Sequence, residues 1–246
     1  MGLTLNACFM NKLDVTVVLP TYNEAENLPL ICEEIANALK KHKYEILVVD
    51  DNSPDGTWKV AEKLGRKYPL RVIRRYSKLG LSSAILTGFY NAKAEFAIVM
   101  DADLQHEASV LPKMLKILKN DHCDLVIGSR YTANGTIDRA WPLKRRLDSK
   151  LATLLARPLT SINDPMSGFF GIKKSLIEKM DQNWLLIGYK LLVEILAKTD
   201  GMLKICEIPI QFKQRLYGET KLNKKEVFNY LKLICKLYWR MIWREK

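Results

Sequence analysis

Long apolar stretches are missing from this sequence of 246 residues. No run reaches the roughly 18 apolar residues that a bilayer-spanning helix needs, and the first dozen residues lack the charged and apolar regions of a secretory signal. The five cysteines are scattered and form no C-x-x-C pair. This spacing argues against a disulfide framework or a zinc site, so we expect reduced thiols in a reducing compartment such as the cytosol.

Glycine is missing where a nucleotide-binding loop would need it. The first predicted strand ends in Val18-Leu-Pro-Thr-Tyr-Asn-Glu24, which contains no glycine, and no P-loop motif occurs in the chain. A dinucleotide-binding fold would place G-x-G-x-x-G at this position. If a nucleotide binds here, its diphosphate is therefore held by a cation rather than by a glycine-rich loop.

The composition is ordinary, but the charge is unevenly placed. The length allows one domain with a large core, and 48% of the residues are apolar. Residues 1–138 carry 17 basic and 17 acidic side chains, whereas residues 139–246 carry 22 and 10, so the whole net charge of +12 lies in the second part. That part suits an anionic partner, although most of its basic side chains are expected to be solvated surface groups.

Short apolar runs alternate with helical patterns over the first 130 residues. This alternation predicts an α/β fold with a doubly wound, mostly parallel sheet and helices on both faces. Continuous apolar runs such as Ile46–Val49 are expected when helices cover both faces of the sheet. The predicted strands are Val15–Pro20, Tyr44–Asp50, Leu70–Arg75, Glu95–Asp101 and Leu125–Arg130, and the predicted helices are 24–41, 55–67, 80–93 and 109–119.

The pattern changes in the second part of the chain. Residues 164–171 predict a loop that leads into a short strand, followed by a helix at 189–199 and a strand at 203–210. Two basic segments, 141–158 and 224–244, have apolar residues at helical spacing. They predict amphipathic helices that lie in a membrane interface. Packing of both helices on the sheet is the alternative.

Two carboxylates, Asp101 and Asp103, end the apolar run that begins at Glu95. Hard divalent cations prefer oxygen ligands, and open α/β folds bind ligands at the carboxyl ends of their strands. At about 4 Å, like charges repel by roughly 1 kcal/mol in water and about 4 kcal/mol at an effective dielectric of about 20, so a diphosphate needs Mg²⁺ or Mn²⁺ between it and these acids. Gln105 adds a neutral oxygen ligand. The alternative is that Asp101 or Asp103 caps the helix that begins near Ser109.

Other strand ends also carry polar residues. The second predicted strand ends in Asp50-Asp51-Asn-Ser-Pro-Asp-Gly56. These carboxylates could accept hydrogen bonds from the N–H edge of a base, but Asp55-Gly56 is also typical of a turn before a helix. Arg130 closes an apolar strand, where an unpaired guanidinium would be costly, and this predicts a phosphate or carboxylate partner.

Six motifs follow one another along the chain: Pro20-Thr-Tyr-Asn-Glu24, Asp50 to Thr57, Asp101-Ala-Asp-Leu-Gln-His106, Gly128-Ser-Arg-Tyr131, Asp164-Pro-Met-Ser-Gly-Phe-Phe170 and Gly218-Glu-Thr-Lys221. Together they resemble the dolichol-phosphate mannosyltransferases, which are inverting family 2 glycosyltransferases of the GT-A fold. The resemblance covers about residues 13–235. We divide the chain into a GT-A-like domain over residues 1–223, which includes segment 141–158, and a C-terminal amphipathic helix over residues 224–246.

The resemblance implies roles for individual residues. Asp103, Arg130 and Arg145 are the implied catalytic residues, with Lys144 or Arg146 as alternatives to Arg145. The metal would be bound by Asp101, Asp103 and Gln105. The implied residues for the nucleotide and its phosphates are Pro20, Tyr22, Glu24, Asp51, Asp101, Gln105, Arg215 and Lys221, and the last two could also contact the acceptor phosphate.

The implied reaction moves mannose from GDP-mannose to dolichyl or another polyprenyl phosphate, with Mg²⁺ or Mn²⁺ as the cofactor. A phosphate monoester has a second pKa of about 6, so near neutral pH it is already a nucleophilic dianion and needs no general base. The lipid acceptor places the enzyme as a peripheral protein on the cytosolic face of a membrane, either the endoplasmic reticulum of a eukaryote or the plasma membrane of a prokaryote. Small membrane-anchoring partner subunits could hold it there.

Three other functions are open from the sequence. The same fold could transfer glucose or another sugar from a UDP-sugar to polyprenyl phosphate. A basic nucleic-acid-binding module would explain the charge but gives Asp101 and Asp103 no role, so we expect no nucleic acid partner. A catalytically inactive scaffold disagrees with the intact acidic and arginine positions.

Overall fold

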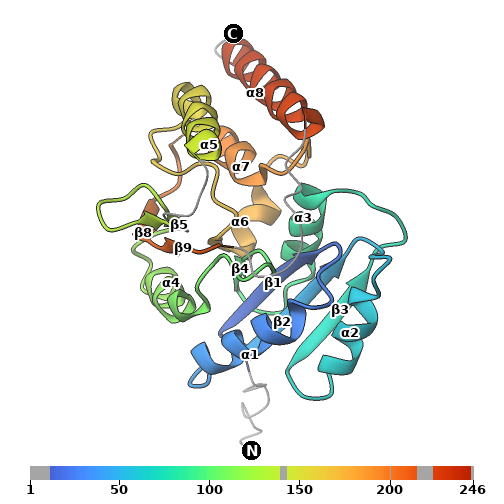
Figure 1. Ribbon diagram of the computed structural model, residues 1–246. Coiled ribbons are helices and arrows are strands. Elements are labelled where there is room, and N and C mark those ends of the chain that lie inside the picture. Colours follow the sequence, from blue (N-terminus) through green and yellow to red (C-terminus); the bar gives the residue numbers. More distant parts are fainter. Residues whose placement is uncertain (1–11, 139–142, 200, 215–223, 245–246) are drawn as a thin grey trace, which may run out of the picture.

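The computed structural model describes residues 12–138, 143–199, 201–214 and 224–244, with the side chains of 143–145 and 244 outside the description (Figure 1). Its elements are β1 (Val15–Thr21), α1 (Leu28–Ala38), β2 (Tyr44–Asp50), α2 (Thr57–Leu64), β3 (Leu70–Arg74), α3 (Leu81–Asn91), β4 (Phe96–Val99), η1 (Ala108–Val110), α4 (Leu111–Lys119), β5 (Leu125–Ser129), β6 (Thr136–Ile137), α5 (Leu143–Ala156), η2 (Arg157–Leu159), β7 (Phe170–Lys173), α6 (Lys174–Lys179), α7 (Leu191–Thr199), β8 (Ile205–Pro209), β9 (Gln211–Phe212) and α8 (Lys224–Arg244).

A seven-stranded sheet in the order β3-β2-β1-β4-β7-β5-β8 forms the centre of the molecule. Parallel pairing joins β1 to β2 and β4, β2 to β3, and β5 to β8. Among the strands of this sheet in the described part of the chain, β7 alone runs antiparallel, between β4 and β5. A second, small sheet pairs β6 with β9. The predicted α/β fold with a mostly parallel sheet is therefore confirmed.

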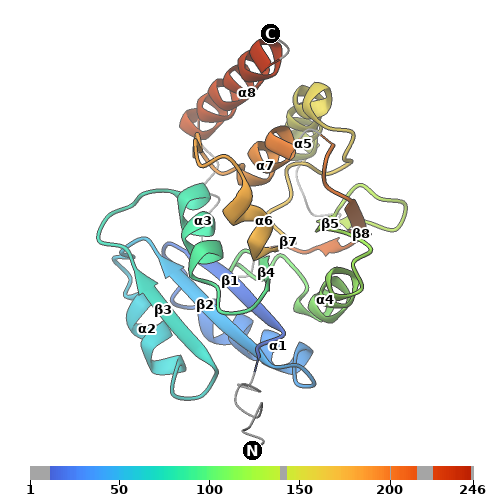
Figure 2. The same cartoon turned by 180° about the vertical axis from the view of Figure 1, so that it is seen from behind.

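Helices cover both faces of this sheet. On one face α1, α2 and α4 pack on alternate strand residues such as Val17, Ile46 and Ile98. On the other face α3, α6 and α7 pack on the residues between them, such as Val18 and Leu47. Every residue of β1 is buried, and the strand carries apolar side chains on both faces. Figures 1 and 2 show the two helical layers from opposite sides.

A third layer lies beyond α7, where α5 and α8 pack on it and on each other. Leu233, Ile234 and Leu237 of α8 join Val193 of α7 and Ala156 at the end of α5 in a separate buried cluster. Figures 1 and 2 both show α5 and α8 at the end of the molecule opposite α1 and α2. The two basic segments thus pack on α7 rather than on the sheet.

The predicted elements of the sheet occur close to their expected positions. All five strands expected in the first 130 residues are present as β1 to β5, and the helices between them are α1 to α4. The six-residue helix α6 and the two-residue strands β6 and β9 were not predicted. No helix in the described part of the chain combines the length and the apolar character needed to cross a bilayer.

One expectation about the cysteines is wrong. The structure pairs Cys123 and Cys206 in a disulfide, with Cα atoms 5.9 Å apart. Cys206 lies in β8, opposite Val126 of β5, and Cys123 lies just before β5. Parallel pairing of β5 and β8 brings together two cysteines that are 83 residues apart in sequence, which their spacing could not reveal. Cys32 and Cys235 are free thiols.

Candidate active site

The carboxyl ends of β1, β2 and β4 meet at one edge of the sheet. After β1 the chain crosses by α1 to β2 on one face, and after β3 it returns by α3 to β4 on the other face. The strand order therefore reverses between β1 and β4, which is where open α/β sheets bind ligands. The chain turns sharply after each strand, since Asn23, Asn52 and Leu104 all adopt positive φ angles of 55–63°.

A cavity of about 680 Å³ opens at this edge. It extends from the strand ends to the wall formed by α3, α5, α7 and α8. The structure brings together here eight of the site residues predicted from the sequence. They are Pro20, Tyr22, Glu24, Asp51, Asp101, Asp103, Gln105 and Arg130.

The remaining predicted residues are not placed in the cavity. Arg215 and Lys221 lie outside the described residues, and Arg145 is in α5 with its side chain outside the description. Of the two alternatives to Arg145, Lys144 has its side chain outside the description. Arg146 donates a hydrogen bond of 2.9 Å from Nη2 to the carbonyl oxygen of Asp138 and does not line the cavity. The roles of these residues stay predictions.

The two acids at the end of β4 have different surroundings. Asp103 is 4% exposed, and its Oδ1 accepts a hydrogen bond of 3.2 Å from the backbone N–H of Gln105. Asp101 Oδ2 lies 3.4 Å from Nε2 of the buried His106, and the Asp101 side chain is 34% exposed. The backbone of Gly168 passes so close to Asp101 that a Cβ at this position would lie 2.8 Å from Oδ2.

The donor set fits a hard cation that shares its coordination with a ligand. No group of three His, Cys, Asp or Glu side chains suited to a metal occurs in the parts of the chain described. The edge offers the carboxylates of Asp101 and Asp103 and the amide of Gln105, whose Nε2 donates 3.0 Å to the carbonyl oxygen of Lys213. Mg²⁺ commonly binds to one or two carboxylates, to substrate phosphates and to water, and Mn²⁺ accepts the same oxygen ligands.

Asp51 lies at the other side of the strand ends, in contact with a buried arginine. Arg75 pairs with Asp51, and the backbone N–H of Gly80 donates 2.9 Å to Asp51 Oδ2. Nearby, Lys78 Nζ stands 3.7 Å from the centre of the Tyr22 ring. The turn after β2 is held by other acids instead, since Asp50 accepts hydrogen bonds from Ser53 and Asp55 accepts them from Thr57. Asp51 is therefore the acid of this loop that lines the cavity.

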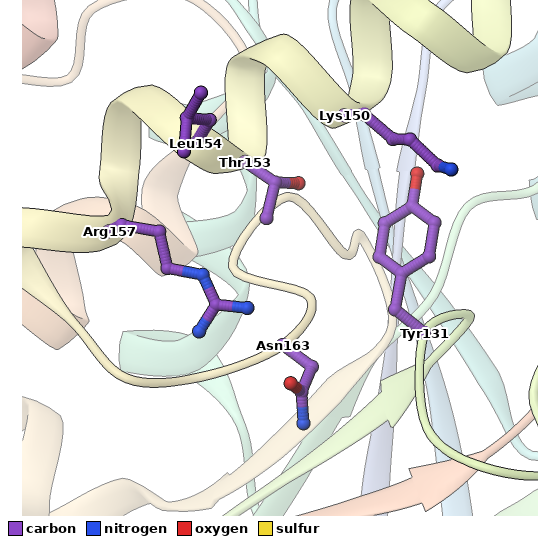
Figure 3. A pocket seen from close by; sticks show the side chains of 6 residues that line it. All are labelled: Tyr131, Lys150, Thr153, Leu154, Arg157 and Asn163. Atoms are coloured by element: carbon purple, nitrogen blue, oxygen red, sulfur yellow. The ribbon is translucent and has the colours of Figure 1, made fainter.

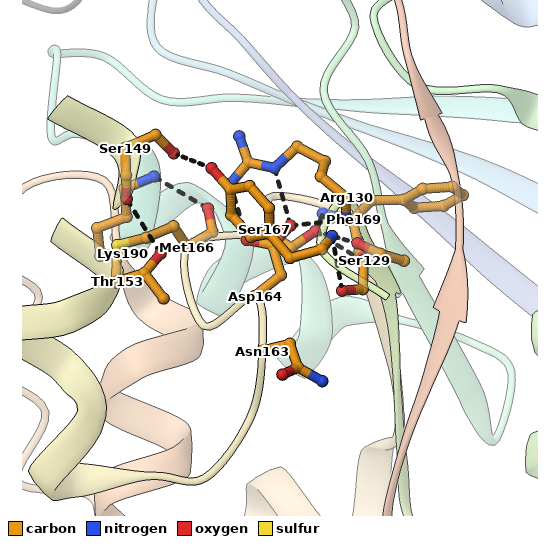
Figure 4. Close-up of polar contacts among 12 residues, drawn as sticks. Ser129, Arg130, Ser149, Thr153, Asn163, Asp164, Met166, Ser167, Phe169 and Lys190 are labelled. Carbon is orange, nitrogen blue, oxygen red and sulfur yellow. Dashed lines mark hydrogen bonds and ion pairs between the residues drawn. The ribbon is translucent and has the colours of Figure 1, made fainter. Parts of the chain in front are cut away.

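The predicted anionic partner of Arg130 is a carboxylate of the protein. Arg130 donates from Nε and Nη2 to the two oxygens of Asp164 at 2.8 and 2.7 Å, and its backbone N–H donates to Asp164 Oδ2 at 3.0 Å (Figure 4). Glu207 in turn accepts the backbone N–H groups of Asn163 and Asp164 at 2.9 and 3.0 Å. Residues of β5, β8 and the 164–171 loop thus fix the guanidinium at the cavity wall.

Burial and charge shift the pKa values of Arg130 and Asp164 in opposite directions. Burial alone would raise the pKa of Asp164, but the hydrogen bonds and positive charge of Arg130 outweigh it and hold the pKa below its ordinary value. Burial would likewise lower the pKa of Arg130, and the carboxylate raises it instead. Both groups are therefore ionised at neutral pH.

The far wall of the cavity is mainly aliphatic. The residues that α3, α5 and α8 contribute include Leu81, Ala84, Ile85, Leu151, Ala152, Leu155, Val227 and Leu231. Asp148, Ser149, Glu226 and Tyr230 add polar groups to the same wall. One cavity therefore joins an acidic sheet edge, a fixed arginine and a largely apolar wall.

A smaller hollow of about 260 Å³ lies on the other side of α5. Its lining includes Tyr131 and Asn163, and Lys150 and Arg157 extend toward it from α5 and η2 (Figure 3). The Tyr131 hydroxyl and Ser149 form a hydrogen bond of 2.8 Å. None of the residues predicted to bind the nucleotide or the metal lines this hollow, so the candidate site is the larger cavity.

Comparison with known proteins identifies the family. Residues 16–181 match Glycosyl transferase family 2. The chain belongs to this family. The resemblance predicted from the six sequence motifs is thus confirmed at the level of the family.

Several family members are similar over most of this chain, and those named here are dolichol-phosphate mannosyltransferases. The protein of that name from Pyrococcus furiosus is 45% identical over 92% of this chain and 64% of its own length. The protein of that name from Saccharomyces cerevisiae is 38% identical over 92% of this chain and 88% of its own length. The chain thus spans less than two thirds of the archaeal relative and most of the yeast one.

Solved structures confirm the GT-A fold. Glucosyl-3-phosphoglycerate synthase from Mycobacterium tuberculosis, crystallised with phosphoglyceric acid, superposes with a TM-score of 0.69 at 18% identity and covers 93% of this chain and 80% of that chain. The same enzyme with Mn²⁺, uridine diphosphate and glucosyl-3-phosphoglycerate gives a TM-score of 0.68 at 17% identity, over 92% and 78% of the two chains. At such identities the likeness concerns the fold, not the substrates.

Sequence reasoning missed several residues of the cavity. Lys78, Lys190 and Phe212 line it. Arg75 supports Asp51, which lines it, and Glu207 supports Asp164, the partner of Arg130. Their partners lie far away in the sequence, for example 24 residues between Arg75 and Asp51 and 43 between Glu207 and Asp164. Short motifs carry no signal for such pairs, although Asp164 itself stands in one of the six motifs.

Proposed function

We propose that this family 2 glycosyltransferase moves mannose from GDP-mannose to dolichyl or another polyprenyl phosphate. The observation that carries the proposal is the single cavity that joins Asp101 and Asp103, through Arg130, to the aliphatic wall of α3, α5 and α8. A sugar nucleotide suits the acidic edge, and a phosphate on an apolar chain suits the opposite end. The names of the relatives in Pyrococcus furiosus and Saccharomyces cerevisiae support mannose as the sugar and dolichyl phosphate as the acceptor.

The reaction needs placement and charge neutralisation more than acid–base chemistry. An oxygen of the acceptor phosphate attacks the anomeric carbon of mannose while the bond from that carbon to the β-phosphate oxygen breaks and its electron pair leaves with GDP. Because the acceptor is already mostly dianionic near neutral pH, no residue has to remove a proton. Arg130, fixed by Asp164, would hold the nucleophile in line, and Arg145 is the second candidate for this task.

The acidic edge would hold the donor. Asp101, Asp103 and Gln105 are the proposed ligands of Mg²⁺ or Mn²⁺, which when bound neutralises charge on the departing diphosphate. Pro20, Tyr22, Glu24 and Asp51 would line the nucleotide pocket, with Asp51 aligned by Arg75 and Gly80. Arg215 and Lys221, which precede α8 in the sequence, are proposed to contact phosphates.

The same proposal places the protein at a membrane surface. Phe228, Leu231, Trp239 and Ile242 form an exposed apolar stripe on α8, and Leu147, Leu151 and Leu154 are exposed on α5. Basic side chains accompany them, as expected for helices that lie in an interface with anionic lipids. We propose a peripheral location on the cytosolic face, in the endoplasmic reticulum of a eukaryote or at the plasma membrane of a prokaryote, with small membrane-anchoring subunits as candidate partners.

Transfer of labelled mannose from GDP-mannose to a short polyprenyl phosphate tests the proposal. We expect wild-type transfer with Mn²⁺ and almost none for Asp103→Asn, whose fold should survive because the sheet core does not depend on this carboxylate. Calorimetric titration with GDP and with UDP, each with Mn²⁺, identifies the base. Tighter binding of UDP, with transfer from UDP-glucose, would replace mannose transfer by the alternative reaction of the same fold. Near-normal activity of Asp103→Asn would remove the metal role.

A further inference from the structure

Lys190 is a cation of the cavity that the proposed reaction does not yet use. It directly precedes α7 and lines the same cavity as Arg130 and Asp101. Its Nζ donates a hydrogen bond of 3.0 Å to the carbonyl oxygen of Met166, in the loop that also carries Asp164 (Figure 4). The preceding turn is fixed as well, since Ser82 Oγ of α3 donates 2.9 Å to the carbonyl oxygen of Gly188.

The ammonium has donors left for a ligand. In the part of the chain that the structure describes, the Met166 carbonyl is the acceptor of its hydrogen bond, whereas an ammonium has three N–H groups. The ammonium interacts electrostatically with Arg130, Asp101 and Asp164. Two further acids, Asp148 of α5 and Glu226 of α8, line the same cavity. Burial, followed by the charge of Arg130, lowers the pKa of Lys190 to about 8 against the attraction of the two aspartates.

Lys198, in the helix that follows Lys190, shows what a lysine with a structural role looks like here. Lys198 of α7 donates hydrogen bonds of 2.9 and 3.2 Å to the carbonyl oxygens of Asp181 and Asn183, and its Nζ lies 4.8 Å from the centre of the Trp184 ring. It does not line the cavity. Lys198 therefore links the loop at residues 181–183 to α7 by hydrogen bonds, whereas the ammonium of Lys190 faces the cavity.

The net charge at this end of the cavity depends on Lys190. The charge of Arg130 is already balanced by Asp164, with which it shares two side-chain hydrogen bonds. The ion pair as a whole is therefore neutral. Among the described residues at this end of the cavity, Lys190 supplies the positive charge that a dianionic phosphate needs.

We infer that Lys190 binds the phosphate of the lipid acceptor together with Arg130 and positions it for attack. The inference rests on the proposed function, since it names the acceptor of that reaction. It adds a substrate-binding residue that none of the sequence motifs contains. Asp101 and Asp103 are the residues proposed to hold the donor diphosphate, so the acceptor phosphate is the anion left to approach Lys190 from the Arg130 side.

Three variants test this role. Lys190→Met removes the charge, Lys190→Arg keeps it, and Lys198→Met is the matched control. Initial rates are measured with a short polyprenyl phosphate varied at saturating GDP-mannose and Mn²⁺, and then with the donor varied. We expect Lys190→Met to raise the KM of the acceptor by about 10- to 100-fold, because it loses a charged hydrogen bond, with the KM of the donor within about twofold of wild type. Lys190→Arg should recover most of this loss.

Thermal melting separates binding from folding. Lys190→Met should melt close to the wild-type temperature, because relief of the desolvation of the ammonium offsets the loss of its hydrogen bond to the Met166 carbonyl. Lys198→Met should melt lower, because two carbonyl groups lose their donor, while its KM for the acceptor stays unchanged. Lys190→Gln provides a second neutral variant if the methionine variant does not fold.

The outcomes distinguish the two proposals. An active wild type with an unchanged acceptor KM in Lys190→Met and Lys190→Gln contradicts the inference alone. So does a rise in the donor KM without one in the acceptor KM, which would place Lys190 at the donor diphosphate. A wild type that transfers no sugar to polyprenyl phosphate contradicts the proposed function itself.

Discussion

Gly168 controls how closely the chain can pass the carboxylate of Asp101. A Cβ on this residue would lie 2.8 Å from Asp101 Oδ2, closer than side-chain carbons normally approach. We predict that Gly168→Ala displaces the carboxylate and lowers kcat/KM for mannose transfer by about 10- to 100-fold, since a shift of about 1 Å can have an effect of that order. Thermal melting should change little. Steady-state rates and Mn²⁺ titration in the presence of GDP measure the two effects.

The control for this prediction is the Asp101→Asn background. If Gly168→Ala acts through the Asp101 carboxylate, it should reduce the activity of Asp101→Asn far less than it reduces that of the wild type, because coupled residues are not additive. Equal reductions in the two backgrounds would show that the glycine acts by another route.

The ion pair of Arg130 and Asp164 should matter for stability as well as for activity. Asp164 is fully buried and Arg130 nearly so. We predict that Asp164→Ala lowers the free energy of unfolding by about 3–5 kcal/mol, because it leaves a buried guanidinium without its carboxylate. Denaturant unfolding measures the loss, and transfer activity should fall with it because Arg130 loses its fixed orientation.

An exposed ion pair supplies the comparison for Asp164→Ala. Glu95 pairs with Lys12 at 2.9 Å, and the two side chains are 45% and 78% exposed, so Glu95→Ala should cost no more than about 1 kcal/mol. The pKa of Asp164 is lowered in the folded protein, so its contribution is present above the ordinary value of 3.8 and is lost as the pH falls below it. Similar losses for both variants at neutral pH would contradict the role given to burial.

The lowered pKa of Lys190 predicts two pH effects of opposite sign. As the pH rises through about 8, Lys190 loses its proton in the folded protein, so the KM of the acceptor should rise in the wild type but not in Lys190→Arg. Between about pH 8 and its ordinary value of 10.5, the unfolded chain holds the proton more tightly, so this lysine makes the folded state more stable as the pH rises. The stability change should stay below about 3 kcal/mol because the side chain is partly exposed. Comparison with Lys190→Met isolates both effects.

At the scale of helices and strands, continuous apolar runs made the sheet predictable. The strands β1, β2 and β4 are buried throughout or nearly so, and a strand covered on both faces is made mostly of apolar residues. The antiparallel position of β7 between β4 and β5 could not be predicted, because its four residues carry no sign of their neighbours. Helix α6, with six residues, is too short for a helical period to show.

The candidate site could also be predicted only in part. Strand ends indicated Asp51, Asp101, Asp103 and Gln105, because parallel strands bring their carboxyl ends to one edge of the sheet. Lys190 and Glu207 were not found, because each acts through contacts with loops elsewhere in the sequence. The sequence indicated that Arg130 needs an anionic partner but not that Asp164, 34 residues later, provides it.

Helix α8 has one side packed on α7 and one exposed apolar side. The exposed side is the one that the sequence predicts to lie in a membrane interface. Trp239 and Trp243 are 64% and 53% exposed, with ring centres 5.3 Å apart. We predict that the double substitution Trp239→Ser and Trp243→Ser weakens flotation with anionic vesicles by about tenfold or more, because it removes apolar area from the interface. The melting temperature should stay close to that of the wild type.

The packed side of α8 provides the opposite control. Leu237 is 3% exposed between α7 and α5, so Leu237→Ala should lower the free energy of unfolding by about 2–5 kcal/mol without weakening flotation of the folded fraction. Vesicle binding of the wild type should also fall with salt, because basic side chains contribute to it. A wild-type protein that stays wholly soluble beside anionic vesicles would contradict the membrane proposal.

At the scale of the whole molecule, the neutral first part and the basic second part meet at the cavity. The first part contributes Asp51, Asp101 and Asp103, and the second contributes Lys190 and the aliphatic wall of α5 and α8. A donor complex formed at the sheet edge should therefore stabilise the whole domain through the strands that carry it. This linkage can be measured without the lipid acceptor.

We predict that GDP with Mn²⁺ raises the melting temperature by about 5–10 °C, since ligand at about 100 times its Kd adds about 2.7 kcal/mol and each kcal/mol shifts a chain of this size by about 2–4 °C. EDTA should abolish the shift without unfolding the protein, because the acidic edge offers GDP no binding without a cation between the charges. Asp103→Asn should show no shift with Mn²⁺, and Lys190→Met should show the full one, because Lys190 is assigned to the acceptor. A shift by GDP that persists in EDTA would mean that the diphosphate is held by the protein alone, against the role proposed for Asp101 and Asp103.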